Sequence, residues 1–66
     1  MYNRYWVVRG IKCGFEMKLF LYGKEAELEG YLDSELKNVF DYYWYRGATD
    51  TEVAHAKALH LRVYMI

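Results

Sequence analysis

The residue types that most often carry enzyme chemistry are scarce in this chain of 66 residues. It holds one cysteine, Cys13, and two histidines, His55 and His60. A catalytic cysteine needs a base and an orienting group beside it, and no local pattern ties either imidazole to Cys13. The histidines stand five positions apart, whereas two metal ligands on one helix face would be about four apart. We therefore expect neither a bound metal nor another cofactor.

Other catalytic patterns are missing as well. The acidic residues Asp33, Glu35 and Asp41 do not form a carboxylate pair of defined spacing, and the chain has no CxxC motif, glycine-rich phosphate loop or Ser-His-Asp arrangement. A chain this short also has little interior for a substrate pocket, which takes roughly 300–1,000 Å³. The sequence thus predicts a protein that is not an enzyme and that acts by contact.

Charge narrows the range of partners. Nine Lys and Arg balance nine Asp and Glu, which excludes the basic footprint of a duplex-DNA binder and the acidic surface of a DNA mimic. No apolar run approaches the length of about 18 residues that a membrane-spanning helix needs. The first ten residues lack the pattern of a signal peptide, and a single cysteine fits a reducing compartment. We expect a cytoplasmic protein.

Tyrosine is the compositional outlier, with eight copies, and aromatic residues make up 20% of the chain. A single small core cannot readily hide so many rings, and each tyrosine hydroxyl needs water or a hydrogen-bond partner. Tyrosine and tryptophan are the residues that protein interfaces concentrate. Some of these rings are therefore expected to lie at the surface and to bind another protein.

The segment 24–46 dominates the elements that would position these residues. It has no proline and one glycine, Gly30, which we take to mark the close approach of another backbone. Its apolar residues recur at spacings of three and four, and they are Leu28, Leu32, Leu36, Val39, Phe40 and Tyr43. On a helix they would share an arc of roughly 120°. The spacing predicts one long amphipathic helix, with Gly47 just beyond its end.

A β-hairpin is predicted before this helix. Residues 3–9 are rich in β-branched and aromatic types, and both of their alternating faces are apolar, so alternation does not choose the buried one. In 15–22 every second residue is apolar, from Phe15 to Leu21, which predicts a strand with one face toward the core. The glycine-bounded segment 10–14 is the predicted turn.

A shorter second helix is predicted from Thr49, because Thr49 and Glu52 have the spacing of a capping box. It would run to about Leu59, and 60–66 would form a last strand; a single helix over 50–64 is the alternative. The order β-β-α-α-β predicts one α+β domain over 1–66, a small antiparallel sheet with both helices on one face. Sheet orders 2-1-3 and 1-2-3 both remain open at this stage.

Two surfaces are candidates for binding. The first is a row on the back of the long helix with 4-3-4-3 spacing, made of Tyr31, Glu35, Asn38, Tyr42 and Tyr45. Its predicted partner-binding residues are Tyr31, Tyr42, Trp44, Tyr45 and Arg46. The second is the outer sheet face, with Phe20, Tyr22, Arg62 and Tyr64. The tyrosine row could instead only cover the rim of the core, and the sheet face could be covered by a chain segment or by another copy.

These patterns favour a small non-catalytic protein-interaction module that acts by surface contact. Oligomerisation is a common way for so short a chain to gain stability, so a homodimer is expected. In format the chain is similar to small inhibitors of host proteins that phages and mobile elements carry. The alternative is a small nucleic-acid-binding regulator that stacks bases on the aromatic sheet face. An accessory enzyme subunit is a third reading.

Overall fold

The computed structural model describes residues 2–66 and confirms the α+β class. Four strands form one sheet in the order β3-β1-β2-β4. They are β1 (Arg4–Lys12), β2 (Phe15–Gly23), β3 (Tyr42–Gly47) and β4 (Val63–Met65). β1 pairs antiparallel with β2 and β3, whereas β4 is parallel to β2, so the sheet is mixed and not purely antiparallel. The C-terminal strand therefore lies beside the second strand, as in 1-2-3, one of the two orders left open by the sequence.

The predicted hairpin is confirmed, with longer strands and a tighter turn. β1 and β2 stay paired from Arg4 opposite Gly23 to Lys12 opposite Phe15. Only Cys13 and Gly14 form the loop, with φ values of 52° and 83°. Positive φ at both loop residues is the geometry that two-residue hairpins favour, and glycine adopts it without steric strain. Gly10 thus belongs to β1 and not to the turn.

The long helix predicted over 24–46 is wrong beyond Leu36. α1 (Glu25–Tyr31) continues into a π-helical segment, η1 (Leu32–Leu36), and the aromatic residues that follow form β3 instead. Aromatic side chains favour strands, and β3 gives β1 its second hydrogen-bonded neighbour. Much of the predicted core stripe still holds: Leu28, Leu32, Leu36 and Phe40 are all buried, whereas Val39 is 39% exposed.

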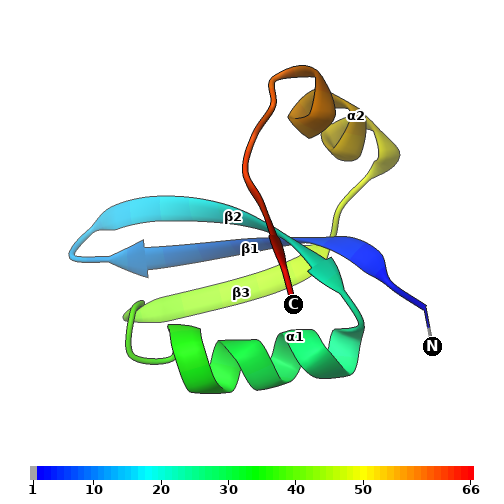
Figure 1. The fold of residues 1–66 in the computed structure, drawn as a ribbon. Helices are drawn as coiled ribbons and strands as arrows, with labels where there is room; N and C mark the ends of the chain where they lie inside the picture. Colours follow the sequence, from blue (N-terminus) through cyan, green and yellow to red (C-terminus); the bar gives the residue numbers. More distant parts are fainter. Residues whose placement is uncertain (1) are drawn as a thin grey trace.

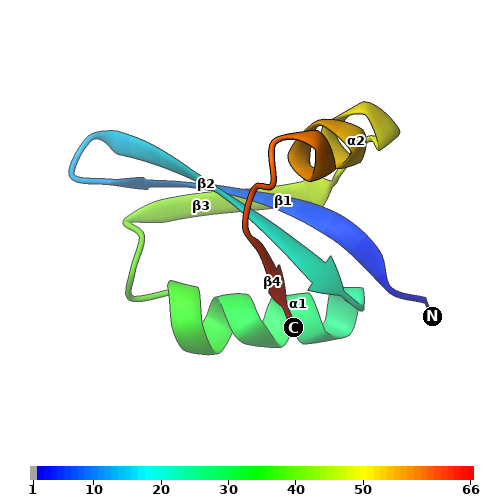
Figure 2. The same cartoon turned by 45° about the horizontal axis from the view of Figure 1, so that its top comes forward.

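The two helices cover opposite faces of the sheet, which corrects the prediction that both lie on one face. In Figures 1 and 2, α1 lies beneath the sheet and α2 (Asp50–Ala58) lies above it. The core under α1 contains Trp6, Val8, Leu21, Leu28, Leu32, Leu36 and Phe40. The smaller core under α2 contains Val7, Phe20 and Ala56. Trp6, Val7 and Val8 are each at most 5% exposed, so β1 is covered on both sides.

The second helix follows the prediction, and the last strand is present but shorter, over Val63–Met65 and not 60–66. The Glu52 N–H donates to Thr49 Oγ1 at 3.1 Å and the Thr49 N–H donates to Glu52 Oε1 at 3.0 Å, which completes the capping box. After α2 the chain turns at His60, whose φ is 54°, and enters β4. A single helix over 50–64 is thereby excluded.

Two glycines sit in opposite surroundings. A Cβ atom added at Gly10 would lie 2.5 to 2.7 Å from three carbons of the Phe40 ring, so Phe40 packs directly onto the β1 backbone. A Cβ atom added at Gly30 would meet nothing within 4 Å, and the expected close approach of another backbone at Gly30 is wrong.

We predict that Gly10→Ala lowers the free energy of unfolding by about 1–3 kcal/mol, because the Phe40 ring cannot keep its position. Gly30→Ala is the matched control and raises it by up to about 1 kcal/mol, since alanine is the better helix former. Urea denaturation of both variants measures the difference. Equal destabilisation by the two substitutions would contradict this packing.

Candidate contact surface

The α2 side of the sheet is only partly covered. Figure 1 shows α2 over one end of the sheet, while the end toward the hairpin turn carries no helix on this side. Strand register places seven side chains on the uncovered part, which we call the open face. They are Arg9 and Ile11 of β1, Glu16 and Lys18 of β2, and Tyr42, Trp44 and Arg46 of β3.

Two aromatic rings stand on the β3 side of the open face. Tyr42 is 64% exposed and Trp44 is 39% exposed. Their ring centroids lie 5.5 Å apart at an interplanar angle of 54°. The Arg9 guanidinium carbon lies 5.9 Å from the Trp44 ring centroid, within cation–π range. Tyr42 and Arg9 thus hold the Trp44 ring in place while leaving much of it open to solvent.

The charged residues of the open face form ion pairs, either with one another or with Glu52 of α2. Arg46 donates to both carboxylate oxygens of Glu52 at 2.6 and 2.8 Å, and Lys18 Nζ lies 3.8 Å from Glu52 Oε2. Arg9 Nε donates to Glu16 at 2.9 Å. The pKa of Glu52 is lowered to about 2, first by the hydrogen bonds from Arg46 and then by the Thr49 N–H. Three cations facing two carboxylates form a polar rim and not a concentrated positive patch.

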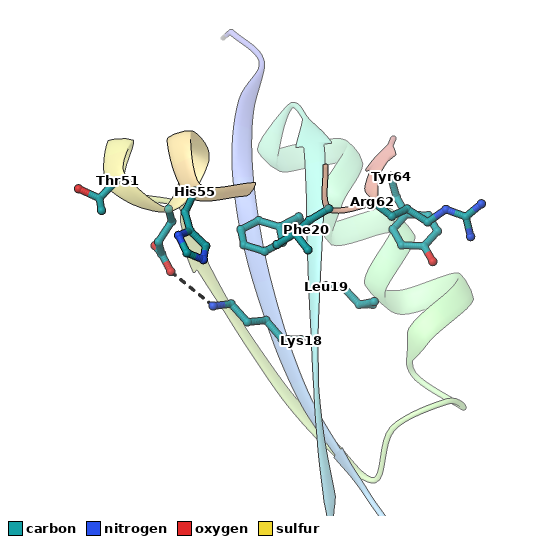
Figure 3. A pocket seen from close by; sticks show the side chains of 9 residues that line it. Lys18, Leu19, Phe20, Thr51, His55, Arg62 and Tyr64 are labelled. Carbon is teal, nitrogen blue, oxygen red and sulfur yellow. Dashed lines mark ion pairs between the residues drawn. The ribbon is translucent and has the colours of Figure 1, made fainter. Parts of the chain in front are cut away.

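An open groove of about 610 Å³ adjoins the open face at Lys18. Its lining residues are Lys18, Leu19, Phe20, Thr51, Glu52, His55, Leu61, Arg62 and Tyr64. Figure 3 shows His55 and Lys18 on one side of β2, and Arg62 and Tyr64 on the other. β4 pairs only with residues 20–22 of β2, so the groove opens where that pairing stops. It can receive an apolar side chain between charged groups.

The predicted tyrosine row does not exist as a row, because its second half is a strand. Alternation along β3 places Tyr42, Trp44 and Arg46 on the open face and turns Tyr45 toward α1. The Tyr45 ring meets Trp6 edge-on at 5.9 Å, and its hydroxyl lies 3.2 Å from Glu29 Oε1. Partial desolvation and then Glu29 raise the pKa of Tyr45. Tyr31 packs against the same core from α1.

The residues of the second predicted surface do not all lie on one face either. Phe20, Arg62 and Tyr64 line the groove, but Phe20 is only 9% exposed beneath α2. Tyr64 is in register with Leu21 and so belongs to the α1 side, which corrects its placement beside Phe20 on one outer face. Tyr22 lies away from the groove, 4.7 Å from the Tyr5 ring centroid.

The sequence analysis did not identify Arg9 and His55 as residues of this surface. Arg9 comes beside Trp44 because β1 and β3 pair in that register. His55 reaches the groove only because α2 crosses this side of the sheet, and nothing local in the sequence indicated that.

The chemistry-bearing residues stay apart. Cys13 is exposed in the hairpin turn, where its N–H donates to Asp41 Oδ2 at 3.0 Å, while the histidines lie at α2 and just beyond it, away from that turn (Figure 1). Within residues 2–66, no three His, Cys, Asp or Glu side chains gather as a metal site would require. Over the same range, no helix has both the length and the apolar content needed to cross a bilayer.

Comparisons with protein-family profiles, with curated proteins and with solved structures gave no match to this chain.

The lowered pKa of Glu52 predicts an acid-sensitive link between α2 and the sheet. A carboxylate with a depressed pKa contributes stability above its ordinary pKa near 4.5, and this contribution is lost as the pH falls toward about 2. Glu52→Gln should therefore lower the melting temperature most at neutral pH, and the gap from the wild type should close at acid pH. Thermal melts across this range measure it.

Titration of the Glu52 side chain by NMR provides the direct check. In the wild type its midpoint should lie well below 4.5, and in Arg46→Gln it should move up toward that value. A midpoint near 4.5 in the native protein would rule out the Arg46 pairing.

Proposed function

We propose that this protein is a non-catalytic interaction module that binds another protein through the open face and the groove beside it. The observation that carries the proposal is the exposed Trp44 ring, packed against Tyr42 and Arg9 on the uncovered half of the sheet. Tryptophan, tyrosine and arginine dominate the binding energy of protein interfaces, and they do so at the centre of a patch with a polar rim.

The groove supports the same reading. Its lining combines the apolar residues Leu19, Phe20 and Leu61 with the charged residues Lys18, Glu52 and Arg62. A partner that presents an apolar side chain flanked by polar groups would match both features. The open face and the groove share Lys18, so one partner can cover both. It would bury the Tyr42–Trp44 pair and also place a side chain in the groove.

Binding of this kind needs no chemistry to have an effect. A protein that occupies a functional surface of its partner blocks it, and this is how we expect the protein to act. An inhibitor of a host protein, carried by a phage or mobile element, remains our proposal for the biological setting.

A nucleic-acid-binding regulator is the second candidate, favoured by the combination of cations and rings on one sheet face. The ion pairs of Arg9, Lys18 and Arg46 reduce the charge available to phosphates. Fluorescence anisotropy with labelled single-stranded RNA and DNA at low and physiological salt separates the candidates, because phosphate contacts weaken steeply with salt. Binding that falls with salt and depends on Trp44 would favour this candidate over the first.

We predict that Trp44→Ala and Tyr42→Ala each weaken partner binding by about tenfold or more, as loss of an interface hot spot does. Affinity capture from the native host, followed by mass spectrometry, identifies the partner, and calorimetry with the purified partner measures the effect.

Phe15→Ala is the matched control. Phe15 is 76% exposed in β2 near the hairpin turn, and its register places it on the opposite side from Trp44. It should leave the affinity within about twofold, a change of under 0.5 kcal/mol. Unchanged affinity in both Trp44→Ala and Tyr42→Ala, with circular dichroism like the wild type, would refute the proposed contact surface.

A further inference from the structure

One edge of the sheet is formed by β3, and in residues 2–66 its strand partner is β1 on one side only. The Ala48 N–H donates to the Tyr5 carbonyl at 2.9 Å, so Tyr5 and Ala48 form a hydrogen-bonded pair. Antiparallel pairs alternate between bonded and non-bonded positions. Trp44 and Arg46 therefore direct their backbone groups toward β1, and Tyr43, Tyr45 and Gly47 direct theirs away from the sheet.

The composition of this edge is unusual. Natural edge strands avoid pairing with other chains by being short, by carrying proline or charged residues, lysine above all, or by being covered. β3 is six residues long, reads YYWYRG and holds neither lysine nor proline, and its charged residue, Arg46, is paired with Glu52. Aromatic residues also favour strand pairing. The opposite edge strand, β4, has only three residues and is protected by its shortness.

We propose that a second copy of the chain pairs antiparallel with β3 about a twofold axis at Tyr45. In this register Tyr45 opposes the partner's Tyr45, and Tyr43 opposes the partner's Gly47. The outward N–H and C=O groups of all three positions then find partners, including the Gly47 carbonyl, which in the single chain accepts from Arg46 Nη1 at 3.2 Å. The two sheets of four strands join into one.

The side chains suit this register on both faces. On the α2 side, Trp44 lies across from the partner's Arg46, a pairing that permits cation–π contact. On the α1 side, the Tyr43 ring lies across from the partner's Gly47, where the guanidinium of Arg4 fills the place of a Gly47 side chain and gives the ring a cation to contact. A twofold arrangement also closes the edge, whereas a non-symmetric pairing would leave edges open for further addition.

Such a dimer would bring the two open faces side by side, with both Tyr42 and Trp44 pairs on one side of the joined sheet. The inference does not rest on the proposed function, because it uses the backbone of the β3 edge and not the binding of another protein. If either the dimer or the proposed binding function were disproved, the other proposal would be unaffected.

Amide hydrogen exchange on the wild-type protein tests the register. In a monomer, the Tyr43, Tyr45 and Gly47 amides exchange fast while those of Trp44 and Arg46 are protected. In the proposed dimer all five are protected, and protection of the first three grows with protein concentration. Sedimentation equilibrium gives the mass of the same samples. Fast exchange at the three outward positions together with a monomeric mass at millimolar concentration would overturn the proposal.

A pair of variants isolates the backbone contact. Tyr43→Pro removes an N–H that β1 does not use, and proline is tolerated in an edge strand when its missing donor faces outward. Tyr43→Ala loses the same ring but keeps the donor. We expect the dimer dissociation constant of Tyr43→Pro to exceed that of Tyr43→Ala by about tenfold or more. Equal dissociation constants would overturn the proposal, and if the proline variant does not fold, the exchange pattern of the wild type decides.

Discussion

The structure depends on one strand that is apolar on both faces. Trp6 and Val8 of β1 point toward α1, and Val7 between them points toward α2, all three nearly or fully buried. Such a strand is stable only in the centre of a sheet with cover above and below. The chain meets this requirement by pairing β1 with β2 and β3 and by placing one helix on each face.

Because each face of the sheet receives only one helical segment, little of the chain is left to cover the two central strands, which are nine residues long. The α1 side receives the longer run of helix together with Phe40, and only its end at the hairpin turn, with Phe15 and Met17, stays exposed. The α2 side receives a single helix of nine residues, which covers Val7 and Phe20 and stops short of the hairpin turn. The open face is thus a consequence of how a short chain covers a doubly apolar strand. Its side chains are rings and paired charges, which suit contact with a protein better than attraction of a polyanion.

The sequence predicted the fold class, the hairpin, α2 and most of the α1 core, because those signals are local. Leu28, Leu32 and Leu36 face the core on a helix of either type, and the Thr49–Glu52 capping box needs only its own neighbours. The segment 42–46 was misassigned because nearly every side chain in it is a large aromatic ring. Such a run satisfies helical spacing and strand alternation equally well, and only the need of β1 for a second neighbour decides between them.

The same ambiguity governed the candidate site. Of the predicted partner-binding residues, Tyr42, Trp44 and Arg46 lie on one face of β3, whereas Tyr45 lies on the other, since a helix would place it beside Tyr42 and a strand places it on the opposite face. Arg9 could not be added without the pairing of β1 with β3. In the first strand, alternation did not select a buried face. That pattern indicates a strand in the centre of a sheet, with both faces covered.

The central claim, that β1 is covered by a different helix on each face, can be tested by nuclear Overhauser contacts in solution. The account predicts contacts from the Ala56 methyl to Val7 or Phe20, and separate contacts from Val8 to the leucines of α1 and η1. Contacts from Val7 and Val8 to the same helix, or none between α2 and the sheet, would contradict it.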